Sequence, residues 1–454
     1  MINTYLKNRR ILFLFSIFLI GILATSTINL VNAADITISP DTPGGLKAAI
    51  ESAKDGDIIS LTNGVYKGKD NTKISIDKSI SIKGLGSKVV FDGQGKNQIF
   101  NISGNKVSLI KLKLKNGYSP ESGGAIHHGK GSLTLNNCTF TNNKANNNGG
   151  AICSSGINRG ASLNAKNSIF TSNKAEYMAG AIFADKLIMS TSTFTNNQAT
   201  ICQGGAVFAM TSTISRCTFT SNKAGYDGGA IETYKTTIIR CTFTNNKSKN
   251  HGGAINNYGK STISGCTFTN NKANNNSGAI ETYKSTISGC TFTNNKANNH
   301  GGAINTHHDK STINKCTFTN NKANNHGGAI NTHYGKSTIN KCTFTNNKAY
   351  MGGAISIGDN SNVINCNFKN NQAKNAGGAI SSENTSSVNK CTFTKNQAKK
   401  SGGAISNYAK SKITNSKFTK NVAGNIYNAI HNHKGKITRK NVKITPKDGT
   451  KVKK

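Results

Sequence analysis

Residues 251–273 read HGGAINNYGKSTISGCTFTNNKA, and close variants of this stretch recur along most of the chain. One phenylalanine per unit recurs every 24 to 26 residues, apart from a single step of 30. An asparagine follows each of these phenylalanines three positions later, and an alanine comes two positions after that, except at Ser248. The recurring phenylalanines are Phe140, Phe170, Phe194, Phe219, Phe243, Phe268, Phe292, Phe318, Phe344, Phe368, Phe393 and Phe418. Such a period predicts a solenoid of stacked repeats.

The residues within one unit favour β-structure. Each unit contains three short runs of β-forming residues, Gly-Ala-Ile, Ser-Thr-Ile and Cys-Thr-Phe, separated by glycine, asparagine and serine. A leucine-rich repeat would need a leucine ladder, but leucine is nearly absent after residue 190. Helical repeats need longer units and good helix formers. The pattern predicts an all-β parallel β-helix, a solenoid with three short strands per coil of about 25 residues.

Period-two alternation predicts which side chains fill the core. In Cys266-Thr267-Phe268, the cysteine and phenylalanine share the inward face and the threonine points outward. Coils stacked about 4.8 Å apart would place each phenylalanine over the previous one. The asparagine three residues later can exchange amide hydrogen bonds with its equivalents above and below, forming an asparagine ladder. The paired glycines before Ala-Ile are expected to supply a positive φ at a tight corner.

The N-terminal 33 residues have the pattern of a secretory signal peptide. Lys7, Arg9 and Arg10 precede an apolar run from Ile11 to Ala24, and small residues around Ala33 provide a cleavage site. The run is short for a membrane span, although an uncleaved anchor remains an alternative. No second apolar run of membrane length follows, so we expect no transmembrane span in the mature chain and an extracellular or cell-surface location.

The remaining chain divides into three parts. Residues 34–120 do not repeat and are expected to form an N-terminal cap with irregular first coils. Within them, residues 45–54 carry apolar side chains at helical spacing and predict a short helix that covers the open edge of the first coil. Residues 121–430 form the repetitive coils, and residues 431–454 form a basic C-terminal tail or cap.

Two groups of motifs resemble known families. The stretch from Leu46 to Tyr66, with Gly56-Asp57 and Gly64-Val65-Tyr66, resembles the start of the pectin-lyase-like β-helix superfamily. The repeats, which pair Gly-Gly-Ala-Ile with Phe-x-x-Asn, are similar to those of chlamydial polymorphic outer-membrane proteins and of adhesin-like proteins of methanogenic archaea. The resemblance implies a right-handed parallel β-helix and an adhesin-like role. No C-terminal translocator barrel or sorting motif is evident in the sequence, so the mode of surface attachment is open.

Positive charge is the strongest functional signal. The formal net charge is +39, from 57 basic and 18 acidic residues, and it is +36 without Lys7, Arg9 and Arg10 (54 − 18). In eight coils a lysine follows the ladder asparagine, which predicts a vertical row of like charges on a turn. This row is either a solvated face or a docking strip for a polyanion. Its members are Lys144, Lys174, Lys223, Lys247, Lys272, Lys296, Lys322 and Lys348.

A second row is aromatic. Tyr234, Tyr258, Tyr283, His307 and His333 lie three residues after the Gly-Ala-Ile isoleucine in five consecutive coils. Such a stripe could stack against sugar rings, or it could simply pack at a strand edge. His300 and His326 form a shorter column, which we interpret as polar turn residues rather than metal ligands. We expect no metal and no cofactor.

Cysteine occupies one repeat position in nine coils, two residues before the phenylalanine. The expected Cβ spacing of about 4.8 Å between coils exceeds the usual disulfide range, so a buried column of reduced thiols is the favoured interpretation. Some disulfides or a metal remain alternatives. The cysteines are Cys138 and, in eight consecutive coils, Cys217, Cys241, Cys266, Cys290, Cys316, Cys342, Cys366 and Cys391.

Carboxylates for catalysis are few. Asp227 and Glu232 share a coil, and Glu281 lies two coils beyond Glu232. One such group on a basic surface is weak support for general acid–base chemistry, so no catalytic residue is assigned. The irregular repeats between Cys153 and Met210, with Arg159 and Asp185, are where a polysaccharide lyase or hydrolase would have its cleft.

The sequence therefore predicts an exported, adhesin-like binding protein rather than an enzyme, with a lyase or hydrolase as the alternative. The expected partners are carbohydrates or acidic polymers of a host or neighbouring cell surface. Nucleic acid is not expected, because an exported protein meets acidic glycans and cell-wall polymers instead.

Overall fold

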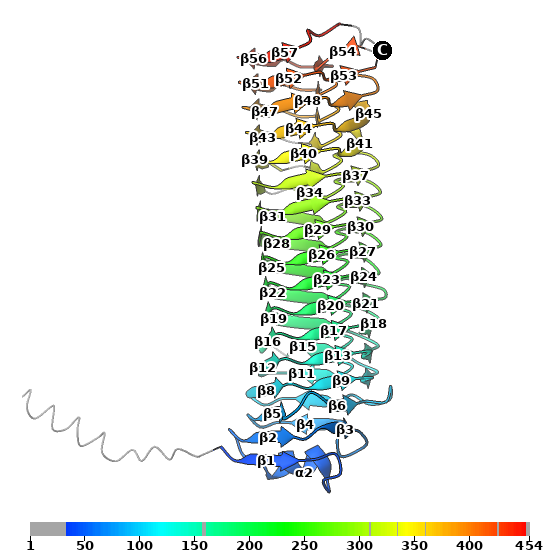
Figure 1. The fold of residues 1–454 in the computed structure, drawn as a ribbon, viewed down its shortest axis with the longest axis vertical. Coiled ribbons are helices and arrows are strands. Elements are labelled where there is room, and N and C mark those ends of the chain that lie inside the picture. Colours follow the sequence, from blue (N-terminus) through cyan, green and yellow to red (C-terminus); the bar gives the residue numbers. More distant parts are fainter. Residues whose placement is uncertain are drawn as a thin grey trace, which may run out of the picture.

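The computed structural model describes residues 33–450 except 157–159, 308, 309, 334, 359 and 425. The coils stack into one long column that runs from the N-terminal to the C-terminal end of the described chain (Figure 1). Three sheets of 27, 14 and 16 strands follow the column axis, and nearly all of their strand pairs are parallel. This architecture confirms the predicted all-β parallel β-helix. The predicted signal peptide lies outside the described residues, apart from Ala33.

A short helix closes the N-terminal end of the column, as the sequence predicted. Helix α2 (Gly45–Ser52) buries Leu46, Ala49 and Ile50. It packs against β1 (Asp35–Ile38) and β4 (Ile74–Ile76) at the blue end of Figure 1. The N-cap residue Gly44 has no side chain to cap the first turn; instead the Leu46 N–H donates to Asn71 Oδ1 at 3.0 Å. The helix thereby covers apolar side chains of the first coil that no preceding coil can cover.

The path of one coil differs from the expected three-run pattern. The Gly-Ala-Ile and Ser-Thr-Ile runs lie in the same sheet, and in some coils they form one strand, as in β28 (Ile255–Ser264). The Cys-Thr-Phe run forms the second sheet, for example in β29 (Thr267–Thr269). The third sheet consists of very short strands such as β30 (Lys272–Ala273). The lysines of the predicted row are therefore strand residues, so the prediction that they lie on a turn was wrong.

The first two runs share a sheet because the chain between them bulges instead of turning a corner. The register of β25 (Ile231–Ile239) against β28 shifts between Thr233 and Thr236 and then resumes. Elsewhere the same connection separates two strands, as with β34 (Ile304–His307) and β35 (Thr312–Asn314), which remain in that sheet. Real corners lie at residues with left-handed backbone. In the coil of residues 251–273, these corner residues include Gly252 (φ 59°) and Asn270 (φ 56°). The left-handed backbone of Gly252 confirms the predicted glycine corner.

Phenylalanine rings form a continuous stack inside the column. From Phe140 to Phe418, neighbouring ring centroids are 4.6 to 4.9 Å apart and the ring planes lie within 12° of parallel. All of these rings are buried. Strand pairing holds each ring directly above its equivalent, as between Phe268 and Phe292. The predicted aromatic column is confirmed.

The cysteine column lines the same interior. The Cys266 N–H donates to Cys290 Sγ at 3.4 Å, and Cys266 Sγ lies 3.3 Å from the Ser264 carbonyl oxygen, to which its thiol can donate. The Cys266 sulfur also accepts from the Cys241 N–H at 3.4 Å, so it has both a donor and an acceptor, an arrangement that suits a protonated thiol. Burial raises the pKa of the Cys138 thiol to about 11, which disfavours its ionisation. The reduced state of the column stays a prediction.

The asparagine ladder is present and continuous. Each ladder asparagine except the last, Asn421, donates from Nδ2 to Oδ1 of its equivalent in the next coil at 2.9 to 3.1 Å. Each Nδ2 also donates to a backbone carbonyl in the previous coil, as Asn271 does to Phe243 at 3.0 Å. The side chains are fully buried or nearly so. The ladder runs through Asn143, Asn173, Asn197, Asn222, Asn246, Asn271, Asn295, Asn321, Asn347, Asn371, Asn396 and Asn421.

The C-terminal segment adds to the stack. Strands β56 (Ile437–Lys440) and β57 (Lys443–Thr445) pair in parallel with β51 (Ser411–Thr414) and β52 (Lys417–Thr419). Beside them, β54 (Ile426–Tyr427) folds back antiparallel on β53 (Val422–Ala423) and ends the third sheet. Part of the segment expected to be a tail or cap is thus β-structure.

Candidate polymer-binding face

The third sheet displays the predicted row of lysines, here called the lysine ridge: Lys144, Lys174, Lys223, Lys247, Lys272, Lys296, Lys322 and Lys348. Strand pairing aligns Lys144 with Lys174, and then Gln198 interrupts the row. Six lysines follow in unbroken register from Lys223 to Lys348. The ladder asparagine before each lysine is buried, so alternation turns the lysine side chain outward. Six members are exposed, and Lys272 and Lys296 are half-buried.

Two hollows follow the ridge along the third sheet. The larger has a volume of about 700 Å³ and is lined by Lys322, Lys348, Gln372 and Gln397, together with Lys374, Lys399 and the intervening alanines. The smaller, of about 260 Å³, contains Lys223, Lys247 and Lys272. Neither lining includes an acidic side chain. Because equivalent residues of successive coils line them, both hollows extend along the column axis.

The predicted aromatic stripe lies on the first sheet, away from the ridge. Ring centroids are 5.6 Å apart between Tyr234 and Tyr258, 5.6 Å between Tyr258 and Tyr283, and 5.2 Å between Tyr283 and His307. The stripe extends beyond the predicted set, because Phe208 meets Tyr234 edge to face at 6.3 Å. Tyr234 is the most exposed of these tyrosines, at 46%. The structure brings the rings of the stripe together, but their contacts with one another cover much of the ring surface.

The backbone of His333 pairs with that of His307 and continues this column. The placement of the His333 side chain lies outside what the structure describes.

Beneath the stripe lie three buried carboxylates that sequence reasoning had regarded only as a scattered group. Asp227, Glu232 and Glu281 are each 1 to 2% exposed. Tyr258 Oη donates to Asp227 Oδ2 at 3.1 Å, and Asn256 Nδ2 donates to Glu232 Oε1 at 3.1 Å. Their burial had no signal in the sequence, because alternation with the core residue Ile231 turns Glu232 outward, yet its side chain is only 1% exposed.

These surroundings shift several pKa values. Burial, and then the nearby Asp227 charge, raises the pKa of Glu232 well above its usual range. Burial also raises the pKa of Asp227, although the His251 N–H that donates to it at 2.8 Å acts in the opposite direction. Burial opposes protonation of His307, but its hydrogen bond to Glu281 and the charge of Glu281 together outweigh this effect and raise the His307 pKa. Burial thus favours the protonated forms of Asp227 and Glu232, whereas the contact with Glu281 favours protonated His307.

A pH dependence follows from the raised Glu232 pKa. Below the pKa of a glutamate in the unfolded chain, about 4.3, the Glu232 carboxyl is neutral in both the folded and the unfolded state. Its ionisation then does not change the free energy of unfolding. As pH rises through the folded-state pKa, the folded state must hold an unneutralised charge and loses stability. We expect Glu232→Gln to be more stable than the parent at about pH 8, with the difference shrinking towards pH 4. Chemical denaturation across this pH range measures it.

The matched control for that experiment is Glu176→Gln, which changes an exposed carboxylate by the same atoms. Its stability should follow that of the parent at every pH. A Glu232→Gln variant that is no more stable at high pH than at low pH, relative to the parent, would contradict the assignment.

The remaining candidates are less organised. The rings of His300 and His326 lie 5.0 Å apart with their planes tilted by 41°, so the predicted column is present. Within the described residues, no three metal-ligating side chains converge. In the irregular coils, Asp185 accepts hydrogen bonds from Ser155 Oγ at 3.0 Å and from the Gly156 N–H at 3.2 Å. Arg159 lies outside the described residues.

Across the described chain, no helix has both the length and the apolar character to span a bilayer.

Comparisons with known proteins agree with the fold. Residues 157–323, 228–398 and 282–444 match the right-handed β-helix region family, and residues 137–155 match the Chlamydia polymorphic membrane protein repeat. A mannuronic acid specific polysaccharide family 6 lyase from human gut microbiota is one similar solved structure. It is 12% identical with a TM-score of 0.46, covering 84% of this chain and 86% of that chain. No curated protein matches.

The family matches confirm the resemblance that the repeats suggested. Together the three overlapping matches span residues 157–444, which is more than half of the 454-residue chain. They cover coils whose parallel register, phenylalanine stack and asparagine ladder are continuous. This chain is therefore a member of the right-handed parallel β-helix family.

Proposed function

We propose that this protein is an exported, surface-associated, adhesin-like protein that binds linear anionic polymers along the lysine ridge. The observation that carries the proposal is the unbroken register of Lys223, Lys247, Lys272, Lys296, Lys322 and Lys348 beside hollows without acidic lining. Acidic glycans and cell-wall polymers have the required charge and length. The chlamydial repeat match supports a surface role.

The ridge favours a polymer over a small ligand because its contacts are individually weak. An exposed lysine contributes at most about 1 kcal/mol to an ion pair in water. A long anionic chain lying along the column axis would meet one lysine per coil, at a repeat of about 4.8 Å. Once one contact forms, the others become effectively intramolecular, and the combined affinity greatly exceeds that of one lysine. Binding should weaken steeply with salt, because exposed charges are screened within about 8 Å at physiological ionic strength.

The test replaces the six consecutive ridge lysines with glutamine. We expect affinity for polygalacturonate, a linear polyuronate, to fall at least about a hundredfold, because the multivalent contact is lost. The matched control replaces six exposed lysines of the first sheet and its margin, at the same cost in net charge: Lys166, Lys186, Lys235, Lys260, Lys284 and Lys310. That control should bind within a few-fold of the parent. Surface plasmon resonance on immobilised polymer measures both variants.

Two results would reject the proposal. Equal losses in the two variants would mean that net charge, and not the ridge, attracts the polymer. Shortening of the polymer during incubation, detected by size-exclusion chromatography, would favour a lyase or hydrolase. Export has its own test, because the N-terminus of the protein recovered outside its source cells should then be Ala34.

A further inference from the structure

A second row of lysines runs along the first sheet, at the residue just before the Ser-Thr-Ile run of each coil. The row is exposed, but Thr211 interrupts it in one early coil, and the shorter residues Asn360 and Thr385 interrupt it in two neighbouring later coils. Strand pairing places these two between the lysine of one earlier coil and those of two later coils. The lysines of the row are Lys186, Lys235, Lys260, Lys284, Lys310, Lys336, Lys410 and Lys436.

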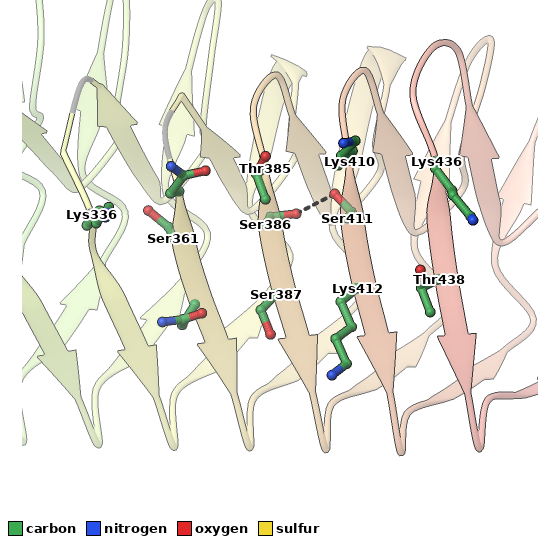
Figure 2. A pocket seen from close by; sticks show the side chains of 12 residues that line it. Lys336, Ser361, Thr385, Ser386, Ser387, Lys410, Ser411, Lys412, Lys436 and Thr438 are labelled. Carbon is green, nitrogen blue, oxygen red and sulfur yellow. Dashed lines mark hydrogen bonds between the residues drawn. The ribbon is translucent and has the colours of Figure 1, made fainter.

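The interruption coincides with a hollow of about 660 Å³. Its lining comes from five neighbouring coils (Figure 2). The first coil contributes Lys336, which precedes β39 (Thr338–Asn340). The others contribute residues of β43 (Ser361–Ile364), β47 (Ser386–Asn389), β51 and β56, with the residue just before each strand. Lysine stems fill this position in most other coils, and the two short residues leave it open. The single break at Thr211 also opens a hollow, flanked by Lys186 and Lys235, but its volume is only about 250 Å³. The two consecutive breaks therefore mark the larger hollow along this row.

The lining has a defined chemistry. Lys336, Lys410, Lys412 and Lys436 supply four positive charges, and the other eight lining residues are serine, threonine or asparagine. Figure 2 shows these polar side chains between the flanking lysines. The base of the hollow is fixed by a hydrogen bond between two of its lining residues. Ser386 and Ser411 are buried, and their hydroxyl oxygens are 2.8 Å apart.

We propose that this hollow, here called the lysine-flanked pocket, binds a short acidic saccharide. Lysines recognise a carboxylate or sulfate, and hydroxyl and amide groups recognise sugar hydroxyls. A volume of this size is typical of small-molecule sites. The lining contains no aromatic ring, so a nucleotide base would have no surface to stack on. The pocket lies on a different sheet from the lysine ridge, so it does not depend on the function proposed for the ridge.

The decisive variant fills the pocket while adding positive charge. Asn360→Lys with Thr385→Lys restores the residue found at the same position of neighbouring coils, and both sites are exposed, so the fold should tolerate it. We expect this variant to bind trigalacturonate at least about tenfold more weakly than the parent, because the added stems occupy the sugar site. A surface that attracted anions by charge alone would instead bind it more tightly.

Three further measurements complete the test. Lys410→Gln with Lys436→Gln should weaken trigalacturonate binding about tenfold, because it removes charge and keeps the space. The methyl-esterified trimer, which lacks the negative charges, should bind the parent at least about tenfold more weakly. The variant with six ridge lysines replaced should bind the free trimer as the parent does, which separates this pocket from the ridge. Isothermal titration calorimetry gives each affinity, with circular dichroism to check folding.

The proposal is overturned if the parent fails to bind trigalacturonate, if the filled variant binds it as well as the parent, or if the esterified trimer binds equally. Loss of trimer binding in the ridge variant would also overturn it, because the ridge and not the pocket would then hold the trimer.

Discussion

Replacing Asn271 with alanine is expected to destabilise the stack by about 3 kcal/mol or more. Asn271 Nδ2 donates to Asn295 Oδ1 and to the Phe243 carbonyl, both at 3.0 Å. Its Oδ1 accepts from the backbone N–H and from Nδ2 of Asn246, also at 3.0 Å. All four hydrogen bonds are buried, so alanine leaves donors and acceptors in two neighbouring coils without partners. Urea denaturation measures the loss, and hydrogen exchange should place it around residues 243–295.

The control for this prediction is the preceding residue. Asn270 is exposed, has a left-handed backbone with φ of 56°, and corresponds to Ser221 (φ 56°) in an earlier coil. Asn270→Ser should therefore cost less than about 1 kcal/mol, as is usual for surface substitutions. Similar losses in the two variants would show that the ladder contributes little beyond the turn that contains it.

Truncating one ring of the aromatic stack should be comparably severe. Phe268 is buried between Phe243 and Phe292, with centroids 4.8 Å away on each side. Phe268→Ala removes the ring and leaves a cavity that the backbone cannot close, since strand pairing fixes the coil spacing. We expect a loss of about 3–5 kcal/mol, measured as the shift in the urea unfolding midpoint.

A volume-conserving variant tests whether stacking or filling matters. Leu114 pairs with Phe140 and occupies the equivalent core position in an early coil, so leucine fits this column. Phe268→Leu should therefore cost less than about 1.5 kcal/mol. If leucine were as damaging as alanine, aromatic stacking itself would be the larger contribution, and the cavity argument would be wrong.

The candidate sites differ in how far the sequence predicted them. The ridge was readable because every member follows a ladder asparagine, and the coil period fixed its spacing. The lysine-flanked pocket was missed, although its signal was present as two consecutive breaks, Asn360 and Thr385, in the row before Ser-Thr-Ile. A periodic search emphasises residues that repeat, whereas a unique pocket arises where the repeat fails. The burial of Glu232 had no local signal at all.

The sequence alone determined the parallel β-helix, its inward phenylalanine column and its asparagine ladder. Period-two alternation and a strict coil period are local properties, and they decide which side chains face the core. Only the tertiary structure decided that the first two runs share a sheet and that pairs such as Lys272–Ala273 form strands of their own. A two-residue strand carries no pattern, and it exists only through hydrogen bonds to coils about 25 residues away along the chain. The burial of Glu232 and the lysine-flanked pocket arise in the same way, because each is assembled from residues of neighbouring coils.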